Sequence, residues 1–502
     1  MKYKGTYFNM WDTWYLNVND TVHGFHLKAH SGENWNVGHI YTEDLLHFKK
    51  MRDVLEALPE EKYPDDCLGK YTGCAVEKDG IYYLYYTMRD RVSSEKIGLA
   101  ISRDLENFTE YENNPVLCPD PDLFAVWEKG KKTNCRDMLI IYDEEREKYF
   151  GYFAAMANIE GRGELGVIGV AESSDLYKWG NQKIVYIPEF NGVVEVPNVF
   201  KINGKWYMTL MTNANYGAKG AVSDSNLNSY TIWASSDTPD GMFKCGEDNV
   251  FMGSSRVNNG YALRSIDYKG KLYAMYIERS VGGSAISLPK EIKEVNGVIR
   301  PYYTDILKAI RTQRKWNDFD FFRVPTAFAW ENVVAGECTK TDEGTEITGY
   351  EKSFQAFSAN IDSVKSLEAE FNISGDFEEA GLVIYCDSDK LEKIYEPENS
   401  TGGVVWKDCV WTANYISFNK KENYVEIRHG MAETICRRQF DFEDSDKIHV
   451  RVIVIEGQFE VYINDVLFIE CGIETKSYMI PGIFAYSGTA LISDFLVYEI
   501  ED

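Results

Sequence analysis

The sequence predicts an all-β protein: a five-bladed β-propeller over residues 1–325, followed by an antiparallel β-sandwich over residues 334–502. Three observations predict this class. Aromatic hairpins with tight polar turns recur along the first two thirds of the chain. A second unit, a strand followed by Ser/Thr-x-Asp and an aromatic residue, comes after the hairpins. Beyond residue 333 the repeat gives way to short alternating strands separated by turns.

The hairpin unit consists of two strands of alternating aromatic residues around a short polar turn. DG, NG and KG between strands of period two favour a tight β-hairpin. A degenerate copy covers 14–29, and four clearer copies are AVEKDGIYYLYYT (75–87), IYDEEREKYFGYFAA (141–155), VFKINGKWYMTLMT (199–212) and SIDYKGKLYAMYIE (265–278).

The second unit adds a further pair of strands to a hairpin. Its copies are VGHIYTEDLLHFKKM (37–51), IGLAISRDLENFTEY (97–111), IGVAESSDLYKWG (168–180) and YTIWASSDTPDGMF (230–243). Two strands followed by two more make a four-stranded blade, so five hairpins predict five blades.

Residues 334–502 have the turn spacing of a sandwich, as in GQFEVYINDVLFIE. We expect this domain to act as a buttress. Glycan binding through exposed aromatics such as Trp406 and Trp411, or dimerisation, are the alternatives.

Composition limits the classes of partner. The formal net charge of −26 disfavours nucleic acid and anionic membranes, because both would be repelled, and is compatible with a neutral small-molecule or oligosaccharide substrate. No apolar run approaches the ~20 residues that a membrane span needs. A homo-oligomer stays open.

The cysteines and histidines give no metal-binding pattern. The ten cysteines include no CxxC pair, and the seven histidines form no HExxH. The N-terminus MKYKGTYFNMWD has no apolar signal region. We therefore expect free thiols, a cytoplasmic location, and neither a cofactor nor a metal ion.

Three acidic residues stand at the entries of three predicted blades. Asp12 lies in MWDTW, Asp137 in NCRDMLIIYD and Glu195 in VVEVPNVFKING. Asp137 and Glu195 precede their hairpins at matching distances, so the repeat places them at similar heights around the propeller axis. Each interrupts an apolar strand.

Converging carboxylates fit glycoside hydrolysis, which needs one protonated acid and one ionised nucleophile or base. A third carboxylate can hold sugar hydroxyls, and Arg136 could keep its neighbour ionised or bind hydroxyls itself. The structural alternative is that each acid accepts backbone amides at a blade junction.

Several motifs resemble clan J glycoside hydrolases, which comprise family 32 and family 68. MWDTWYL with GFHL is similar to the first motif of the clan, and to the Trp-Asp-Ser-Trp-Pro string of family 68 levansucrases. NWNVGHIYTEDLLHF, YTGCAV, CRDM and VEVPNVF resemble, in order, four further motifs of family 32. With the downstream sandwich, the resemblance covers nearly the whole chain.

The resemblance implies roles for individual residues. Asp12 would be the nucleophile, Glu195 the general acid/base, and Asp137 the transition-state stabiliser that binds fructosyl hydroxyls. Attack of Asp12 on C2 of a β-fructofuranoside, followed by water or another sugar, would retain configuration. The substrate-binding residues that the resemblance implies are Trp11, His30, Trp35, Cys74 and Arg136.

Three positions depart from the family pattern. Trp11 replaces the asparagine before the nucleophile, Met138 replaces the proline after the stabilising aspartate, and Cys74 replaces a serine. The acids are retained while their neighbours change, which predicts an unusual fructoside, such as a difructose anhydride or a short oligosaccharide, cleaved by hydrolysis or transfer.

Two other functions fit the same residues. An inverting family 43-like arabinofuranosidase or xylosidase also uses two aspartates and a glutamate from three blades. A carbohydrate-binding protein without catalysis is the alternative from another class, although three desolvated carboxylates contribute little to a lectin. A family 130-like phosphorylase is disfavoured because no cluster of basic residues suits phosphate.

Overall fold

The computed structural model describes residues 4, 10–29, 35–58, 68–127, 132–222, 224–254, 260–280, 283–318, 320–324, 337–386, 412–430, 433–442, 447–473 and 478–501. The chain divides into two compact units, residues 1–253 with 257–306 and residues 254–256 with 307–502. The predicted domain bounds stay predictions; the structure groups residues 307–324 with the second unit.

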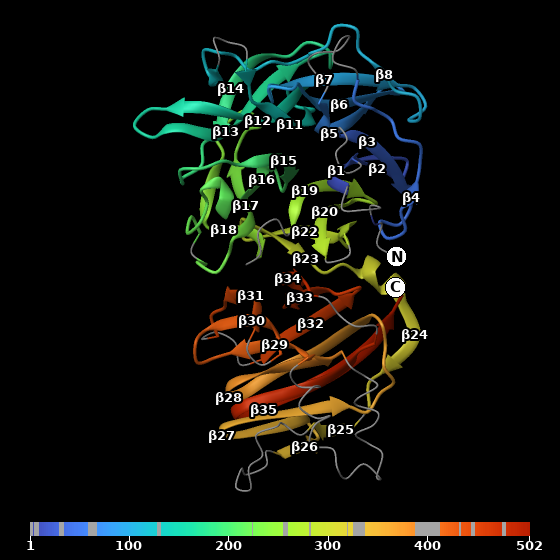
Figure 1. Cartoon of the computed structure of the whole chain (residues 1–502), viewed down its shortest axis with the longest axis vertical. Helices are drawn as coiled ribbons and strands as arrows, with labels where there is room; N and C mark the ends of the chain where they lie inside the picture. Colours follow the sequence, from blue (N-terminus) through green and yellow to red (C-terminus); the bar gives the residue numbers. More distant parts are fainter. Residues whose placement is uncertain are drawn as a thin grey trace. The chain divides into compact units, whose positions relative to one another are not determined.

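The first unit contains four separate four-stranded sheets, which follow one another from blue to green in Figure 1. The first sheet has β1 (Met10–Val18), β2 (Thr21–Lys28), β3 (Asn36–Thr42) and β4 (Lys49–Lys50). The second has β5 (Gly69–Lys78), β6 (Ile81–Arg89), β7 (Glu95–Ser102) and β8 (Thr109–Glu110). The third has β11 (Cys135–Asp143), β12 (Lys148–Ile159), β13 (Gly163–Ser173) and β14 (Gly180–Tyr186), and the fourth β15 (Glu195–Ile202), β16 (Lys205–Asn213), β17 (Ser229–Ser236) and β18 (Lys244–Ser254).

A fifth segment follows the same hairpin plan. It has β19 (Tyr261–Tyr268), β20 (Lys271–Ser280), β21 (Gly283–Ile286), β22 (Lys290–Val295) and β23 (Val298–Tyr302). β20 pairs with β19, β21 and β22, and β22 pairs with β23, all antiparallel. This segment belongs to a larger sheet. The propeller-like arrangement is therefore confirmed, and the count of five blades stays a prediction.

Apolar clusters hold neighbouring segments of the first unit together. Trp14 and Tyr86 belong to a cluster shared by the first and second sheets, and Ile40 and Met275 to one shared by the first sheet and the fifth segment. Further clusters join the second sheet to the third and the third to the fourth. The first strands β1, β5, β11, β15 and β19 contact one another in turn, and β19 contacts β1. These five strands form a closed ring.

The second unit consists of antiparallel strands around one large apolar cluster. Its strands are β24 (Arg311–Trp316), β25 (Phe321–Val324), β26 (Glu337–Thr341), β27 (Gly344–Ala359), β28 (Leu367–Tyr385), β29 (Asn414–Asn419), β30 (Tyr424–His429), β31 (Glu433–Gln439), β32 (Lys447–Ile455), β33 (Gln458–Ile463), β34 (Val466–Gly472) and β35 (Ile480–Ile500). β28 pairs with β35 along most of its length, with β32 on its first half and with β29 on its second. The unit is all-β, as the sequence predicts for a sandwich.

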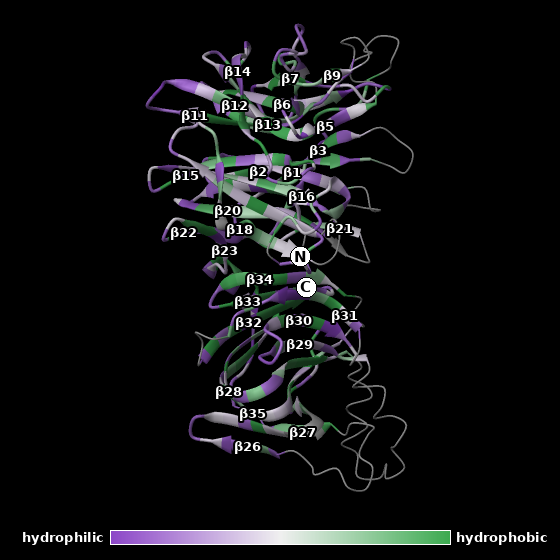
Figure 2. Cartoon of the chain, turned by 90° about the vertical axis from the view of Figure 1, so that its left-hand side faces the viewer, coloured by the Kyte–Doolittle hydropathy of each residue, from purple (hydrophilic) through white to green (hydrophobic). Residues whose placement is uncertain are grey.

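The remaining elements are short. They are the strand pair β9 (Val126–Trp127) and β10 (Lys132–Thr133) and the 3₁₀ helices η1 (Ala214–Tyr216) and η2 (Asp305–Ile310). Hydrophobic and hydrophilic stretches alternate along individual strands (Figure 2), as strands with one buried face require. None of the helices among the described residues is long and apolar enough to cross a membrane.

Replacement of Gly73 by alanine is expected to destabilise the propeller-like unit. A Cβ atom at Gly73 would lie 1.9 Å from the carbonyl oxygen of Tyr85 on the adjacent strand β6, so backbone would have to move. We expect Gly73→Ala to lower the free energy of unfolding by roughly 1–3 kcal/mol, the usual cost of overpacking. Thermal unfolding would measure the change. The matched control is Gly180→Ala, whose Cβ would meet no atom within 4 Å; equal losses in both variants would contradict the prediction.

Candidate active site

Each of the five first strands has a break in its pairing register near its start. The breaks lie between Trp11 and Thr13 in β1, Tyr71 and Cys74 in β5, Arg136 and Leu139 in β11, Glu195 and Asn198 in β15, and Tyr261 and Arg264 in β19. A β-bulge takes residues out of the ladder and redirects their side chains, and bulges are common beside active sites. Asp12 and Asp137 lie inside such breaks, and Glu195 borders one.

The bulges of β11, β15 and β19 contain residues in the left-handed region. Asp137 has φ 60°, Val196 φ 52° and Ala262 φ 56°. A β-branched residue such as valine adopts this region only where the surroundings impose it. The backbone N–H of Val196 donates to Oδ2 of Asp137 at 3.2 Å, which ties the bulges of β15 and β11 together.

A threonine links the bulges of β5 and β11. The Thr87 hydroxyl donates to the carbonyl oxygen of Thr72 at 2.8 Å, and its oxygen accepts from the backbone N–H of Asp137 at 3.1 Å. The positions of the acidic side chains thus depend on hydrogen bonds between strands that are distant in sequence.

The three acids line one cavity of about 340 Å³. Its other lining residues include three of the predicted substrate-binding residues, Trp11, Trp35 and Arg136, and several that the sequence did not single out. The full lining is Trp11, Asp12, Leu27, Trp35, Tyr71, Thr72, Thr87, Arg89, Glu95, Arg136, Asp137, Glu195, Val196 and Tyr261.

Asp12 is buried and held by one of its two carboxylate oxygens. The Thr72 hydroxyl donates a short hydrogen bond to Oδ2. Oδ1 is buried and has no hydrogen-bond partner among the described residues. Burial raises the pKa of Asp12 to about 6, the Thr72 hydrogen bond opposes this shift, and the nearby charge of Glu195 adds to it.

Both carboxylate oxygens of Glu195 are engaged. Arg136 donates from its terminal nitrogen to Oε1 at 2.8 Å, and the Tyr261 hydroxyl donates to Oε2 at 3.0 Å. Burial also raises the pKa of Tyr261 well above its ordinary value, so the phenol stays protonated and remains a donor.

Arg136 stands among three carboxylates. Besides Glu195, its guanidinium donates to Glu95 at 3.4 Å and lies 3.7 Å from Oδ2 of Asp137. Burial alone lowers the pKa of Arg136, but the carboxylates together raise it well above its ordinary value. Burial raises the pKa of Asp137, which Arg136 opposes and the charges of Glu195 and Asp12 increase. The neighbouring carboxylate charges thus favour the protonated form of Asp137, and Arg136 favours its ionised form.

Aromatic rings form part of the cavity wall. The rings of Trp11 and Tyr261 lie 4.8 Å apart between centroids, and those of Trp35 and Tyr71 lie 6.3 Å apart. Flat apolar faces beside carboxylates suit a sugar, whose C–H faces pack on rings while its hydroxyls bind to charged groups.

The family model described as glycosyl hydrolases family 32 N-terminal domain matches residues 12–276. The chain belongs to glycosyl hydrolase family 32. This family 32 chain is a glycoside hydrolase, so a family 43 enzyme and a binding protein without catalysis are set aside.

Solved structures share the fold of this family 32 enzyme along nearly the whole chain. An exo-inulinase from Aspergillus awamori has 15% identity and a TM-score of 0.70, covering 100% of this chain and 98% of its own. A sucrose-6-phosphate hydrolase from Lactobacillus gasseri has 16% identity and a TM-score of 0.69, covering 98% and 91%. A β-fructofuranosidase from Bombyx mori has 16% identity and a TM-score of 0.68, with the same coverage.

Two predicted substrate-binding residues of the family 32 enzyme are not in the cavity that holds the acids. Cys74 is buried and lines a different cavity, because it follows the bulge of β5 and lies farther along the strand than Thr72. The assignment of Cys74 to the sugar pocket is corrected accordingly. His30 lies outside the described residues. Of the two tryptophans that flank Asp12, Trp11 lines the cavity and Trp14 packs in a core cluster.

Six polar residues of the cavity escaped the sequence analysis: Tyr71, Thr72, Thr87, Arg89, Glu95 and Tyr261. Two of them had a pattern that could have identified them. Thr72 stands in the same YTGCAV string as Cys74, and Tyr261 precedes its hairpin at the offset of Asp137. Arg89 and Glu95 lie at the end of β6 and the start of β7. Only the pairing of these two strands brings them to the cavity.

The described side chains of the site do not match the residue groups that bind metal ions. Within the described part of the chain, no three His, Cys, Asp or Glu side chains are grouped to hold a metal ion. The carboxylates instead face arginine, threonine and tyrosine donors, which suit proton transfer and hydroxyl binding.

Asp12→Asn is expected to be more stable than the native chain above pH 6. The folded pKa of Asp12, about 6, exceeds its ordinary value of 3.8, so ionisation favours the unfolded chain as pH rises from 4 to 6. The gain should reach about 1–3 kcal/mol at pH 8 and vanish below pH 4, where the carboxyl is neutral in both states. Thermal unfolding from pH 4 to pH 8 would measure it.

The matched control is Asp104→Asn, in an exposed turn. Hydrogen bonds from Asn107 and Glu106 lower the pKa of Asp104, so its charge favours the folded chain. This variant should lose stability relative to the native chain as pH rises. The same sign of change in both variants would contradict the assignment for Asp12.

Proposed function

We propose that this family 32 enzyme cleaves β-fructofuranosides with retention of configuration. Asp12 attacks the anomeric carbon, Glu195 protonates the leaving oxygen and later activates water, and Asp137 binds fructosyl hydroxyls in the transition state. The family assignment and the fold shared with a β-fructofuranosidase and an exo-inulinase support the substrate class.

The hydrogen bonding of the Asp12 carboxylate is the main observation in support of the proposal. Asp12 lines the cavity. Thr72 holds its Oδ2, and its Oδ1 is buried and has no hydrogen-bond partner among the described residues. An oxygen in that state is available to form a covalent bond, whereas a carboxylate that only capped backbone amides would have its oxygens satisfied.

Glu195 is supported as the proton carrier by its coupling to the other acids. It accepts from Arg136 and Tyr261 and is close enough to Asp12 and Asp137 for its charge to raise their pKa values. When Asp12 becomes an ester, one negative charge disappears from the group.

The substrate proposed is a fructo-oligosaccharide or an unusual short fructoside such as a difructose anhydride. Trp11 gives the wall an aromatic face where the family resemblance implies an asparagine. An apolar ring in place of an amide changes which sugar hydroxyls are bound, because it packs against C–H faces and offers no carbonyl acceptor. We place the enzyme in the cytoplasm, consistent with the free thiols of its eight described cysteines.

Release of fructose from a panel of fructosides should identify the substrate. The panel contains sucrose, inulin, levan, fructo-oligosaccharides and difructose anhydrides. We expect Asp12→Ala to lose on the order of 10⁴-fold in kcat on the best substrate, since it lacks the nucleophile, and Asp104→Asn to keep native activity. Chromatography of the released fructose measures both. No fructose from any substrate would overturn the proposed function.

The configuration of the product tests the mechanism. With methanol as acceptor, a retaining enzyme forms methyl β-fructofuranoside, because two displacements at C2 restore the original configuration. We expect this anomer by NMR. Formation of the α anomer would contradict a covalent role for Asp12.

Glu195→Ala should show the loss of an acid catalyst. We expect kcat on the best natural fructoside to fall roughly 10²–10⁴-fold. A fructoside whose leaving group is already a weak base needs no protonation and should lose much less. Comparison of kcat for the two substrates measures the difference, and equal losses would assign Glu195 another role.

A further inference from the structure

We propose that Arg264 is a positioning residue of this active site. Its guanidinium fixes the bulged backbone of the strands that carry the acids, and it supplies a fixed positive charge near them. The inference rests on the proposed function for the identity of the acids. Arg264 itself lies outside the cavity that they line.

The guanidinium binds three strands at their bulges. One terminal nitrogen donates a short hydrogen bond to the carbonyl oxygen of Pro197, in the bulge of β15. The other donates to the carbonyl oxygen of Asp137 in β11 at 3.0 Å and to that of Gly73 in β5 at 3.5 Å. Because Arg264 belongs to β19, one side chain connects four of the five strands of the ring.

Each bound carbonyl lies within two residues of a group that touches the reaction. Pro197 follows Glu195 by two residues, the bonded carbonyl of Asp137 belongs to the stabilising acid itself, and Gly73 follows Thr72. Thr72 in turn holds Asp12. A shift of any of these carbonyls would move an acid, and a displacement of about 1 Å in an active site can cost on the order of 10²-fold in rate.

The charge of Arg264 is buried and uncompensated by a direct ion pair. The residue is 1% exposed, and no carboxylate among the described residues forms a salt bridge with it. Burial lowers its pKa, although an arginine remains protonated in the pH range of enzymes. Its field lowers the pKa values of Asp12 and Asp137 and so opposes the effect of burial on both.

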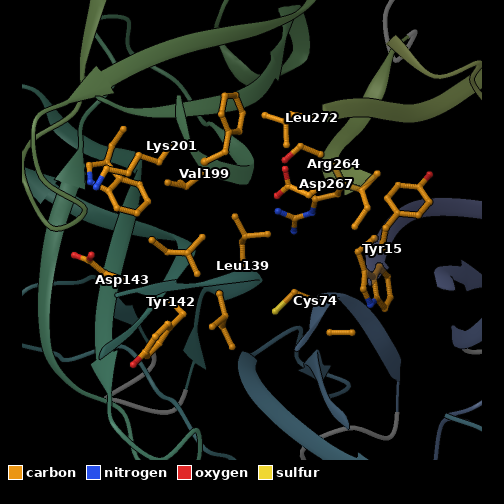
Figure 3. Close-up of a pocket in the computed structure, with 18 of the residues that line it drawn as sticks. Tyr15, Cys74, Leu139, Tyr142, Asp143, Val199, Lys201, Arg264, Asp267 and Leu272 are labelled. Carbon is orange, nitrogen blue, oxygen red and sulfur yellow. The ribbon is translucent and has the colours of Figure 1, made fainter. Parts of the chain in front are cut away.

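Arg264 lines a second cavity of the same unit. It has a volume of about 470 Å³, and Cys74, Leu139 and Val199 line it together with Arg264. Figure 3 shows the Arg264 guanidinium pointing toward these side chains. Truncation of Arg264 would therefore leave a space that a small guanidinium ion can enter from this cavity.

The test compares Arg264→Ala, Arg264→Gln and Arg264→Lys with the native enzyme on the best substrate. Arg264→Ala should lose on the order of 10²-fold in kcat with little change in KM, and the acidic limb of its pH profile should move to higher pH. Millimolar guanidinium, but not urea, should restore at least tenfold of the loss. Arg146→Ala, which removes an arginine 37% exposed at the surface, is the matched control and should change none of these.

The conservative variants separate charge from geometry and replace Arg264→Ala if that variant does not fold. Arg264→Lys keeps the charge without the planar set of donors, so kcat should fall while the acidic limb stays in place. Arg264→Gln lacks the charge, so the acidic limb of its pH profile should move to higher pH. Native kcat in Arg264→Gln, or a loss of kcat in Arg264→Gln with the acidic limb of the pH profile unshifted, would overturn the proposal.

A stability measurement distinguishes failure of this proposal from failure of the proposed function. If the native enzyme releases no fructose, thermal unfolding from pH 4 to pH 8 replaces kcat as the readout. Without the charge of Arg264, ionisation of Asp12 and Asp137 costs more in the folded state. Arg264→Gln should therefore lose stability progressively as pH rises, and a deficit that is constant with pH would overturn the proposal.

Discussion

The hydrogen bonds from Arg264 to three backbone carbonyls are the contacts on which the rest of the site depends. The strands β5, β11 and β15 each leave their ladder beside residues that line the cavity. A bulge leaves a backbone carbonyl without a partner in the sheet. A single guanidinium satisfies these carbonyls at once. The bulges of β5, β11 and β15 therefore depend on one another, because they share hydrogen bonds to the same side chain.

Burial of several carboxylates in one cavity is costly, and the structure offsets the cost with cations at two levels. Arg136 contacts Glu95, Asp137 and Glu195 inside the cavity. Arg264 forms no ion pair with a carboxylate among the described residues, but its positive charge lowers the pKa values of Asp12 and Asp137. Partial compensation suits catalysis, because fully paired acids would lose their capacity to exchange protons, while unpaired acids would destabilise the fold. The raised pKa values of Asp12 and Asp137 are the result of this balance.

Much of the fold could be predicted from the sequence, because β-strands show a period of two in their apolar residues and tight turns require particular residue types. The repeated hairpins mark the strands of the four separate sheets, and the acids were found because Asp137 and Glu195 interrupt apolar strands at matching offsets. The fifth segment shows the limit of this approach. Its hairpin follows the repeat, but its strands belong to a larger sheet, and no local pattern reports which strands extend a sheet.

The sequence by itself determined the all-β class, the hairpin repeat and the family, and it singled out the three acids that line one cavity, since each of these features is carried by residues within short segments. The tertiary structure decided which of their neighbours meet them. Cys74 and Thr72 are two positions apart, yet the bulge of β5 places them at different cavities. Arg89, Glu95 and Arg264 reach the acids or their backbone only through strand pairing and ring closure. Contacts between residues distant in the chain depend on the register and closure of the whole ring, which no local stretch of sequence encodes.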